Sequence, residues 1–326
     1  MVKKVVFLGM GGTIAGRSAD RADNVGYQSA QVGVAELLAG IPGLGAALSG
    51  VQPESEQVAQ VDSKNMDWPQ WQSLYTRALH HLQRDGVGAL VITHGTDTLE
   101  ETAFFLSQVL PAHLLASKPV VLTCAMRPST ADFPDGPTNL CDAAVVANAP
   151  DARGVLVVCA GSVHIARDVQ KVHPYRLNAF SSGEAGSIGF VEEGQVRWAR
   201  PLVPQASRAK VGLPLPPPPW PRVEIVMNTV GMGGALVRAL CVASAEPDVE
   251  VAGIVVAGTG NGTMNQDMEA ALADARTQGI RVVITTRCAT GQLVGVRGGP
   301  VADVAYLGLS VVKARVALVL ELLRAR

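Results

Sequence analysis

Threonine residues in two glycine-rich turns are the first candidates for chemistry in this sequence. Thr13 lies in the turn at residues 9–18, directly after an apolar run that is typical of a buried strand. Thr96 lies in a second turn, at residues 94–98, which follows another apolar run and also contains Asp97. A threonine hydroxyl can act as a nucleophile when a neighbouring group accepts its proton, so the two turns point to covalent catalysis.

Each of these residues also has an ordinary structural interpretation. A threonine in a glycine-rich turn is more often a turn or capping residue than a nucleophile. Asp97 or Thr98 can cap the helix that is predicted to follow, and His94 is predicted to be a structural, hydrogen-bonded residue rather than a general base. Capping explains one polar residue of the second turn but not the whole set, which favours the chemical interpretation.

The glycine spacing excludes the common nucleotide-binding loops. A G-x-G-x-x-G motif that starts at Gly9 needs glycine at position 14, where the chain has Ile14. A Walker A loop that starts at Gly11 has Arg17 where a lysine must contact the phosphates. The chain has no G-x-S-x-G or H-E-x-x-H motif and no metal-site spacing of cysteine and histidine. We therefore predict chemistry without a cofactor and without a metal.

Composition narrows the choice of partner and compartment. The chain carries 27 Lys and Arg against 28 Asp and Glu, and this balance argues against a nucleic-acid surface. No run of about 18 apolar residues predicts a membrane helix, and glycines soon interrupt the apolar run after Lys4, which favours a strand over a signal peptide. The five cysteines contain no C-x-x-C and are predicted to be reduced, buried residues. We expect a cytoplasmic protein with a small-molecule substrate and no nucleic-acid or membrane partner.

Short apolar runs alternate with helix-like segments along the chain. Strands are predicted at residues 4–9, 89–93, 119–123, 154–159, 223–227, 253–257 and 281–285, and helices at residues 67–85, 99–110, 139–148, 265–278 and 310–323. Asp67 is the predicted cap of the first of these helices. Because the strands are apolar on both faces, we predict an α/β fold with mostly parallel sheets that helices cover.

A proline-rich segment at residues 213–222 divides the chain into two parts. Its prolines exclude a helix or a central strand, and a stiff linker is favoured over a ligand for SH3 or WW domains. We predict a larger N-terminal catalytic domain at residues 1–200 with a mostly parallel sheet, a proline-rich linker at 201–222, and a smaller C-terminal α/β domain at 223–326.

The order of the motifs resembles that of the bacterial-type L-asparaginase family. The matching segments are residues 11–16, 94–102, 125–130, 135–140, 167–171 and 257–262. The resemblance implies a two-domain asparaginase-like fold, usually assembled as a homotetramer of intimate dimers, with a homodimer as the alternative. It also implies hydrolysis of L-asparagine to L-aspartate and ammonia through a threonine acyl-enzyme.

The resemblance assigns catalytic roles to residues of both turns. It implies that Thr13 is the nucleophile and that Tyr27 is its hydroxyl partner. It places Thr96, Asp97 and Lys171 in a second catalytic group, in which Lys171 beside Asp97 would move a proton through Thr96.

The same resemblance implies a substrate-binding set. Ser63 matches the residue that holds the substrate α-carboxylate, and Asp97 matches the one that holds the α-amino group. Ala125 matches a residue whose carbonyl faces the substrate amide. The backbone N–H groups of Gly12 and Thr96 would form the oxyanion hole.

Three regions depart from the family pattern. Met10 replaces a threonine before the first turn, where we expect little effect. Lys64, included in the substrate-binding set, replaces a Gln or Glu and cannot accept a hydrogen bond from a substrate ammonium, so we expect it to pair with a carboxylate or to turn away. Around Thr263 and residues 292–299 no glutamate matches the one that a neighbouring subunit supplies in secreted relatives, which leaves activity on glutamine open.

Two other functions stay open at this point. A related amidohydrolase would act on L-glutamine or another amide, including a transamidating subunit for glutamyl-tRNA, which the near-zero charge disfavours. A catalytically weak amino-acid sensor would keep the pocket but has no need of the hydroxyl and lysine groups, so their joint presence argues against it.

Overall fold

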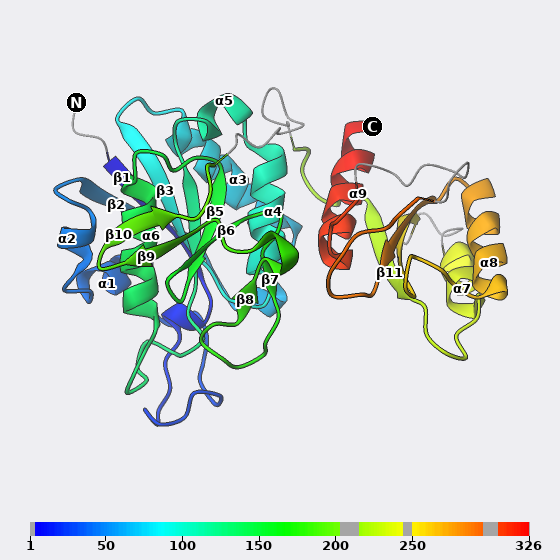
Figure 1. Cartoon of the computed structure of the whole chain (residues 1–326), viewed down its shortest axis with the longest axis horizontal. Coiled ribbons are helices and arrows are strands. Elements are labelled where there is room, and N and C mark those ends of the chain that lie inside the picture. The colour runs from blue at the N-terminus through cyan, green and yellow to red at the C-terminus, as the bar shows by residue number, and fades with distance from the viewer. Residues whose placement is uncertain (1–3, 203–214, 244–249, 296–305, 326) are drawn as a thin grey trace. The chain divides into compact units, whose positions relative to one another are not determined.

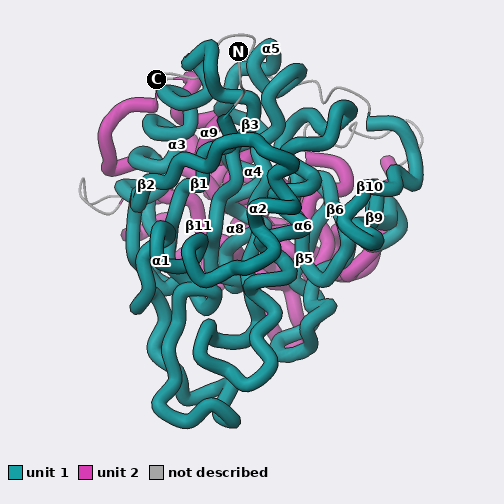
Figure 2. The backbone as a smooth tube through the Cα atoms, turned by 90° about the vertical axis from the view of Figure 1, so that its left-hand side faces the viewer, with its two compact units in different colours: residues 1–214 teal, residues 215–326 magenta. Residues whose placement is uncertain are grey.

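The computed structural model of the chain describes residues 4–202, 215–243, 250–295 and 306–325. The chain divides into two compact units, residues 1–214 and residues 215–326 (Figure 2). Positions 203–214 of the linker expected at 201–222 fall outside the described residues. The domain boundaries drawn from the sequence therefore stay a prediction.

A mixed eight-stranded sheet lies at the centre of unit 1 (Figure 1). Its strand order is β10-β9-β6-β5-β4-β3-β1-β2. The strands are β1 (Lys4–Gly11), β2 (Gln52–Val61), β3 (Val87–Thr93), β4 (Val120–Thr123), β5 (Val155–Cys159), β6 (Ser162–Ile165), β9 (Gly189–Glu192) and β10 (Gln195–Trp198). The pairs between β2 and β5 are parallel, as predicted, and those from β5 to β10 are antiparallel. The antiparallel strands of four residues each were missed because their apolar runs are too short to recognise.

Helices cover both faces of this sheet, which explains why the central strands are apolar throughout. On one face pack α1 (Val34–Ala39), α2 (Leu44–Ala47) and α6 (Gly136–Asn148), and on the other pack α3 (Trp68–Leu82) and α4 (Leu99–Val109) (Figure 1). The short helix α5 (Ala112–Leu115) precedes β4. Asp67 caps α3 as predicted, in a capping box with Gln70. Outside the main sheet, β7 (Gln170–Lys171) and β8 (Phe180–Ser181) pair with each other.

Unit 2 contains a smaller parallel sheet. Its strands β11 (Arg222–Met227), β12 (Val251–Gly258) and β13 (Arg281–Thr286) lie in chain order. Its helices are α7 (Ala235–Ala243), α8 (Gln266–Thr277) and α9 (Val311–Ala325). The α/β class predicted for this part of the chain is confirmed. Among the described residues, no helix is both long and apolar enough to span a membrane.

The cysteines only partly follow the prediction. Cys124 and Cys159 are buried at the ends of the neighbouring strands β4 and β5, and burial raises the pKa of the Cys124 thiol well above its usual range. Cys141 and Cys241 are half-buried. The prediction of burial is wrong for Cys288, which is exposed in the loop after β13.

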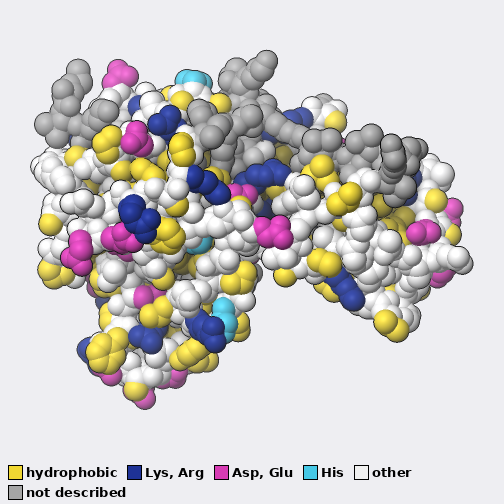
Figure 3. All heavy atoms as spheres, viewed as in Figure 1, with side chains coloured by type: hydrophobic (Ala, Val, Ile, Leu, Met, Phe, Trp, Pro, Cys, Tyr) yellow, Lys and Arg dark blue, Asp and Glu magenta, His cyan; other side chains and the backbone are white. Residues whose placement is uncertain are grey.

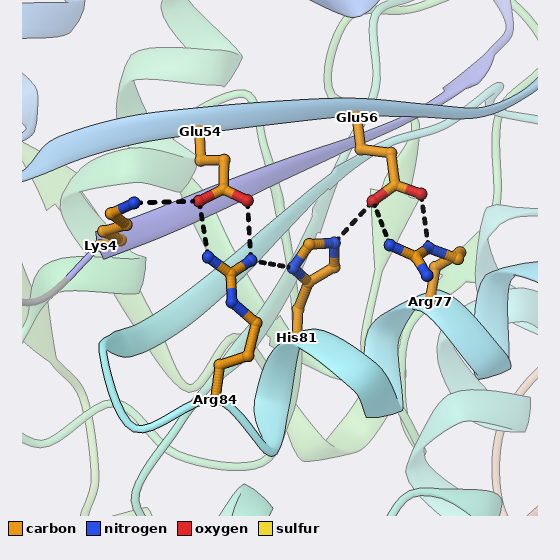
Figure 4. A network of polar contacts seen from close by, with 6 residues as sticks. All are labelled: Lys4, Glu54, Glu56, Arg77, His81 and Arg84. Carbon is orange, nitrogen blue, oxygen red and sulfur yellow. Dashed lines mark hydrogen bonds and ion pairs between the residues drawn. The ribbon is translucent and has the colours of Figure 1, made fainter.

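Strand β2 is the largest element that the sequence analysis missed. Its sequence is polar because it forms the edge of the sheet, where charged side chains also protect a strand against unwanted pairing. An ion-pair network joins it to the end of α3 (Figure 4), through the side chains of Lys4, Glu54, Glu56, Arg77, His81 and Arg84. Arg84 donates to both oxygens of Glu54 at 2.7 and 2.9 Å. The network ties the edge strand to α3, and β2 leads into the candidate site at its far end.

We expect this network to make stability dependent on pH. The hydrogen bonds from Arg84 lower the pKa of Glu54 from 4.5 to about 2, so folding favours the charged carboxylate. This stabilisation is fully present above pH 4.5 and is lost as the pH falls toward 2. In urea unfolding, Glu54→Gln should therefore lower the free energy of unfolding at pH 7 and change it little at pH 2.

A matched control for this prediction is Glu36→Gln. Glu36 also pairs with an arginine, Arg17, but both side chains of that pair are more than half exposed, so its loss should cost less than about 1 kcal/mol. A loss of stability in Glu54→Gln that is the same at both pH values would show that the carboxylate charge is not involved.

Candidate active site

Four neighbouring strands of unit 1 end at one edge of the sheet, and each is followed by a predicted site residue. Thr13 follows β1, Ser63 follows β2, Thr96 follows β3 and Ala125 follows β4. Strand β1 has β2 on one side and β3 on the other, so the direction of the chain connections reverses there. Ligands of open α/β sheets bind at such a reversal, beyond the carboxyl ends of the strands.

Two glycines bring the turns after β1 and β3 into contact. A methyl group built on Gly12 would lie 2.3 Å from Gly95 Cα, and one built on Gly95 would lie 2.4 Å from Ser63 Oγ. Gly12 has φ 81° and ψ −170°, a conformation that is almost restricted to glycine. Glycine at both positions therefore allows the segments that carry Thr13, Ser63 and Thr96 to lie against one another.

Thr13 and Tyr27 form the first hydrogen-bonded pair of the site. Their hydroxyl oxygens are 2.6 Å apart, and Thr13 is 6% exposed, in a short 3-10 helix at Thr13–Ala15. Arg17 and Gln28 exchange two backbone hydrogen bonds, so the intervening loop leaves the turn and returns to it. This return places Tyr27 beside Thr13, although fourteen positions separate them in the sequence.

Thr96, Asp97 and Lys171 form the second group. Lys171 Nζ donates to Thr96 Oγ1 at 2.8 Å and to Asp97 Oδ1 at 2.6 Å. The Lys171 side chain is 17% exposed, whereas Asp97 is half exposed and can reach a ligand. Because Lys171 supplies the hydrogen of its bond to Thr96, the hydroxyl hydrogen of Thr96 can point to a third group.

Ser63 joins the second group from the end of β2. It is buried, and its Oγ accepts the N–H of Asp97 at 3.2 Å. Its carbonyl oxygen accepts the hydroxyl of Thr98 at 2.9 Å. Thr98 is the N-cap residue of α4, but its side chain makes no capping hydrogen bond. Its hydroxyl is used for the bond to Ser63, so it does not cap the helix as one of the two expected candidates.

Ala125 is held by residues that the sequence analysis did not single out. Asp135 accepts the N–H groups of Met126 and Arg127 at 2.8 and 3.0 Å, and Asn139 donates to the carbonyl of Cys124 at 2.9 Å. These contacts fix the backbone on both sides of Ala125, which is fully buried. Both residues belong to the segment 135–140, so the motif itself was the available signal.

Lys64 lies outside the hydrogen-bonded groups described above. Its ammonium pairs with Asp62 at 3.3 Å, and its side chain is 67% exposed. Of the two outcomes expected from the sequence, it pairs with a carboxylate. Thr263 lies in unit 2, where it forms hydrogen bonds with Thr259, and positions 296–299 of the stretch 292–299 are outside the described residues.

His94 is a structural residue, as predicted. It is fully buried, and burial lowers its pKa to about 4, so the imidazole is neutral at pH 7. Nδ1 donates to the carbonyl of Gly95 at 2.8 Å, because a carbonyl can only accept. Nε2 then accepts the hydroxyl of Thr102 at 3.0 Å, and Thr102 accepts the indole N–H of Trp71 at 2.9 Å. Both ring nitrogens are occupied by structural hydrogen bonds.

Charged side chains of both signs lie on one face of the described part of the chain (Figure 3). On the face shown in Figure 3, Lys and Arg side chains lie among Asp and Glu side chains rather than in one basic patch. Within the described residues, no group of three or more His, Cys, Asp or Glu side chains is arranged to hold a metal ion. The site itself combines hydroxyl groups, one carboxylate and one ammonium, which suits nucleophilic attack and proton transfer.

Comparison with known proteins identifies the same family in both halves of the chain. Residues 4–204 match the family model "Asparaginase, N-terminal", and residues 222–323 match the model "Glutaminase/Asparaginase C-terminal domain". Together these matches cover most of the sequence.

Named relatives agree with the family models. The glutaminase-asparaginase of Pseudomonas fluorescens biotype A is 36% identical over 89% of this chain and 77% of its own length. L-asparaginase 2 of Bacillus subtilis is 35% identical over 87% of this chain and 72% of its own length. The crystal structure of a probable cytoplasmic L-asparaginase from Campylobacter jejuni matches with a TM-score of 0.85 and 30% identity, covering 98% of this chain and 95% of that one.

Proposed function

The chain belongs to the asparaginase family, and from that premise we propose that it hydrolyses L-asparagine to L-aspartate and ammonia through an acyl-enzyme on Thr13. Family membership makes it an amidohydrolase. The observation that carries the mechanism is the juxtaposition of two hydrogen-bonded groups, Thr13 with Tyr27 and Lys171 with Thr96 and Asp97, at the ends of β1 and β3.

In the first step Thr13 Oγ1 attacks the side-chain amide carbon of the substrate. Tyr27, 2.6 Å away, orients the hydroxyl, and the proton passes through Thr96 to Lys171, which must enter the step as the neutral amine. The backbone N–H groups of Gly12 and Thr96 stabilise the oxyanion. The C–N bond then breaks, the nitrogen takes up the proton that Lys171 received, and ammonia departs while the acyl group stays on Thr13 as an ester.

In the second step water attacks the ester carbon. The group of Thr96 and Lys171 accepts a proton from this water, and Thr13 leaves with its hydroxyl restored. Aspartate is released, so one amide and one water yield one carboxylate and one ammonium ion. The same lysine serves both steps, which is why its position relative to Thr96 matters.

Substrate recognition is assigned to groups around the two turns. We assign the α-amino group to Asp97, whose half-exposed carboxylate can accept from an ammonium. We assign the α-carboxylate to Ser63, and the amide to the carbonyl of Ala125. We assign no substrate group directly to Lys64, because its ammonium pairs with Asp62.

L-Glutamine is the second candidate substrate. The relatives that carry the name glutaminase-asparaginase include one from Pseudomonas fluorescens and one from Acinetobacter glutaminasificans, the latter 34% identical over 88% of this chain. Lys64 is the residue of the set that departs from the family pattern, and we propose that it affects the choice between the two amides.

We also propose a cytoplasmic location and a homotetramer or homodimer. The location is supported by the likeness to the probable cytoplasmic enzyme of Campylobacter jejuni, although a relative in Haemophilus influenzae is named a probable periplasmic L-asparaginase. Light scattering of the purified chain measures the assembly, and a monomer at working concentration would contradict it.

The function is tested by ammonia release from L-asparagine and from L-glutamine, with aspartate and glutamate measured as co-products. We expect release from L-asparagine with one aspartate for each ammonia. Release from L-glutamine alone would establish the second candidate. A folded chain that releases ammonia from neither amide would contradict both.

A further inference from the structure

The proposed mechanism depends on where Lys171 is held, and this residue lies outside the main sheet. Lys171 belongs to the two-residue strand β7, which pairs with the equally short β8. Its side chain must nevertheless reach Thr96 and Asp97, which lie 75 and 74 positions earlier in the sequence. The contacts between β7 and the chain after β3 therefore decide whether the ammonium reaches its partners.

Glu100 makes a contact of this kind. It lies in the first turn of α4. Its Oε1 accepts the backbone N–H of Lys171 at 3.1 Å. Lys171 is thus held at both ends by one short segment, its backbone by Glu100 and its ammonium by Thr96 and Asp97.

Holding both ends matters because a lysine side chain has many conformations. A free lysine loses conformational entropy when its ammonium is confined to one place. When the backbone of Lys171 is fixed, fewer positions are open to its ammonium. The position beside Thr96 and Asp97 is therefore favoured. A displacement of a catalytic group by about 1 Å can cost about 100-fold in rate.

We infer that Glu100 is a positioning residue, which holds the backbone of Lys171 so that its ammonium meets Thr96 and Asp97. This inference rests on the proposed function, because it gives Lys171 a task in proton transfer. Glu100 acts on the backbone of Lys171. For this role it needs an oxygen at the position of Oε1 that accepts the Lys171 N–H.

Glu100 also affects its own helix and the local charge, and the test has to separate both effects from positioning. An acidic residue in the first turn of a helix stabilises that helix, and Glu101 shares this position in α4. A carboxylate near Lys171 also acts through its charge. Glu101→Ala is therefore the matched control for the helix, and Glu100→Gln removes the charge but keeps an oxygen that accepts the N–H of Lys171.

The test compares kcat and KM for L-asparagine in Glu100→Ala, Glu100→Gln and Glu101→Ala. We expect Glu100→Ala to lower kcat by about 10- to 100-fold. Its KM should stay close to that of the unaltered chain. Glu100→Gln should restore most of kcat with the pH dependence of kcat unchanged, and Glu101→Ala should leave kcat unaltered. Equal kcat in both alanine variants, or a Gln variant as slow as the Ala variant, would overturn the inference.

Hydrogen exchange gives a second measurement that does not depend on activity. Loss of the hydrogen bond to a carboxylate should speed exchange of the Lys171 amide by about tenfold in Glu100→Ala. Exchange should remain slow in Glu100→Gln and in Glu101→Ala. A chain that shows this exchange pattern but does not hydrolyse L-asparagine would contradict the proposed function. The hydrogen bond between Glu100 and the Lys171 amide would still be supported. An amide that exchanges equally fast in all variants would contradict the contact itself.

Discussion

We expect Thr13→Val to lower kcat/KM for L-asparagine by at least about 1,000-fold, whereas Thr13→Ser should keep measurable activity. Valine keeps the branched shape of threonine but lacks the hydroxyl, so no acyl-enzyme can form. Serine keeps the hydroxyl that lies 2.6 Å from Tyr27 and loses only a methyl group. The activities of the two variants are compared by measuring ammonia release with a coupled assay, on chains purified in the same way.

Folding has to be controlled in this comparison. Thr13 is buried, so thermal unfolding of both variants should be recorded beside the activity. The prediction holds if Thr13→Val unfolds at nearly the same temperature as Thr13→Ser and is inactive. A folded valine variant with full activity would remove Thr13 from the role of nucleophile and leave Thr96 as the hydroxyl to test next.

Gly12→Ala is expected to damage both stability and activity. The new methyl group would lie 2.3 Å from Gly95 Cα and 2.4 Å from Gly95 N, and no side-chain rotation can relieve a clash with backbone atoms. Alanine also disfavours the positive φ of Gly12, which is 81°. Overpacking and backbone strain together should lower the free energy of unfolding by at least about 2 kcal/mol, as measured by urea unfolding.

The same substitution separates the turns that carry Thr13 and Thr96. A shift of about 1 Å between them should reduce the activity of the folded fraction by about 100-fold. Gly45→Ala is the control, because a methyl group there meets nothing within 4 Å and Gly45 lies in α2, where alanine is favoured. If Gly12→Ala were as stable and active as Gly45→Ala, the close contact at Gly95 would not exist.

Buried elements were predictable from the sequence because their patterns are local. Strands β1, β3, β4 and β5 are covered on both faces, so nearly all of their residues are apolar and each run stands out. The start of α3 was predictable for a similar reason, since a capping box involves residues only three positions apart.

Edge and surface elements were not predictable in this way. Strand β2 is polar because its exposed side carries charges, and its partners Arg77 and Arg84 come from α3 and the turn that follows it. No alternation of apolar residues marks it. Lys64 was undetermined for a related reason, because its pairing with Asp62 depends on how an exposed side chain turns.

The sequence by itself determined which residue types stand at the carboxyl ends of the strands, including Thr13 in one turn and Thr96 with Asp97 in another. It also determined the α/β class, because the alternation of apolar strands with helices is a local pattern in the sequence. The family resemblance named Tyr27 and Lys171, but no local pattern shows that either of them reaches these turns.

Only the tertiary structure decided that these groups meet. The sheet order places the ends of β1 and β3 side by side, and the contact of Gly12 with Gly95 closes the gap between their turns. Lys171 reaches Asp97 across 74 positions, and the bond from its backbone to Glu100 has no local signature. Such contacts depend on the packing of distant segments, which local propensity and periodicity do not encode.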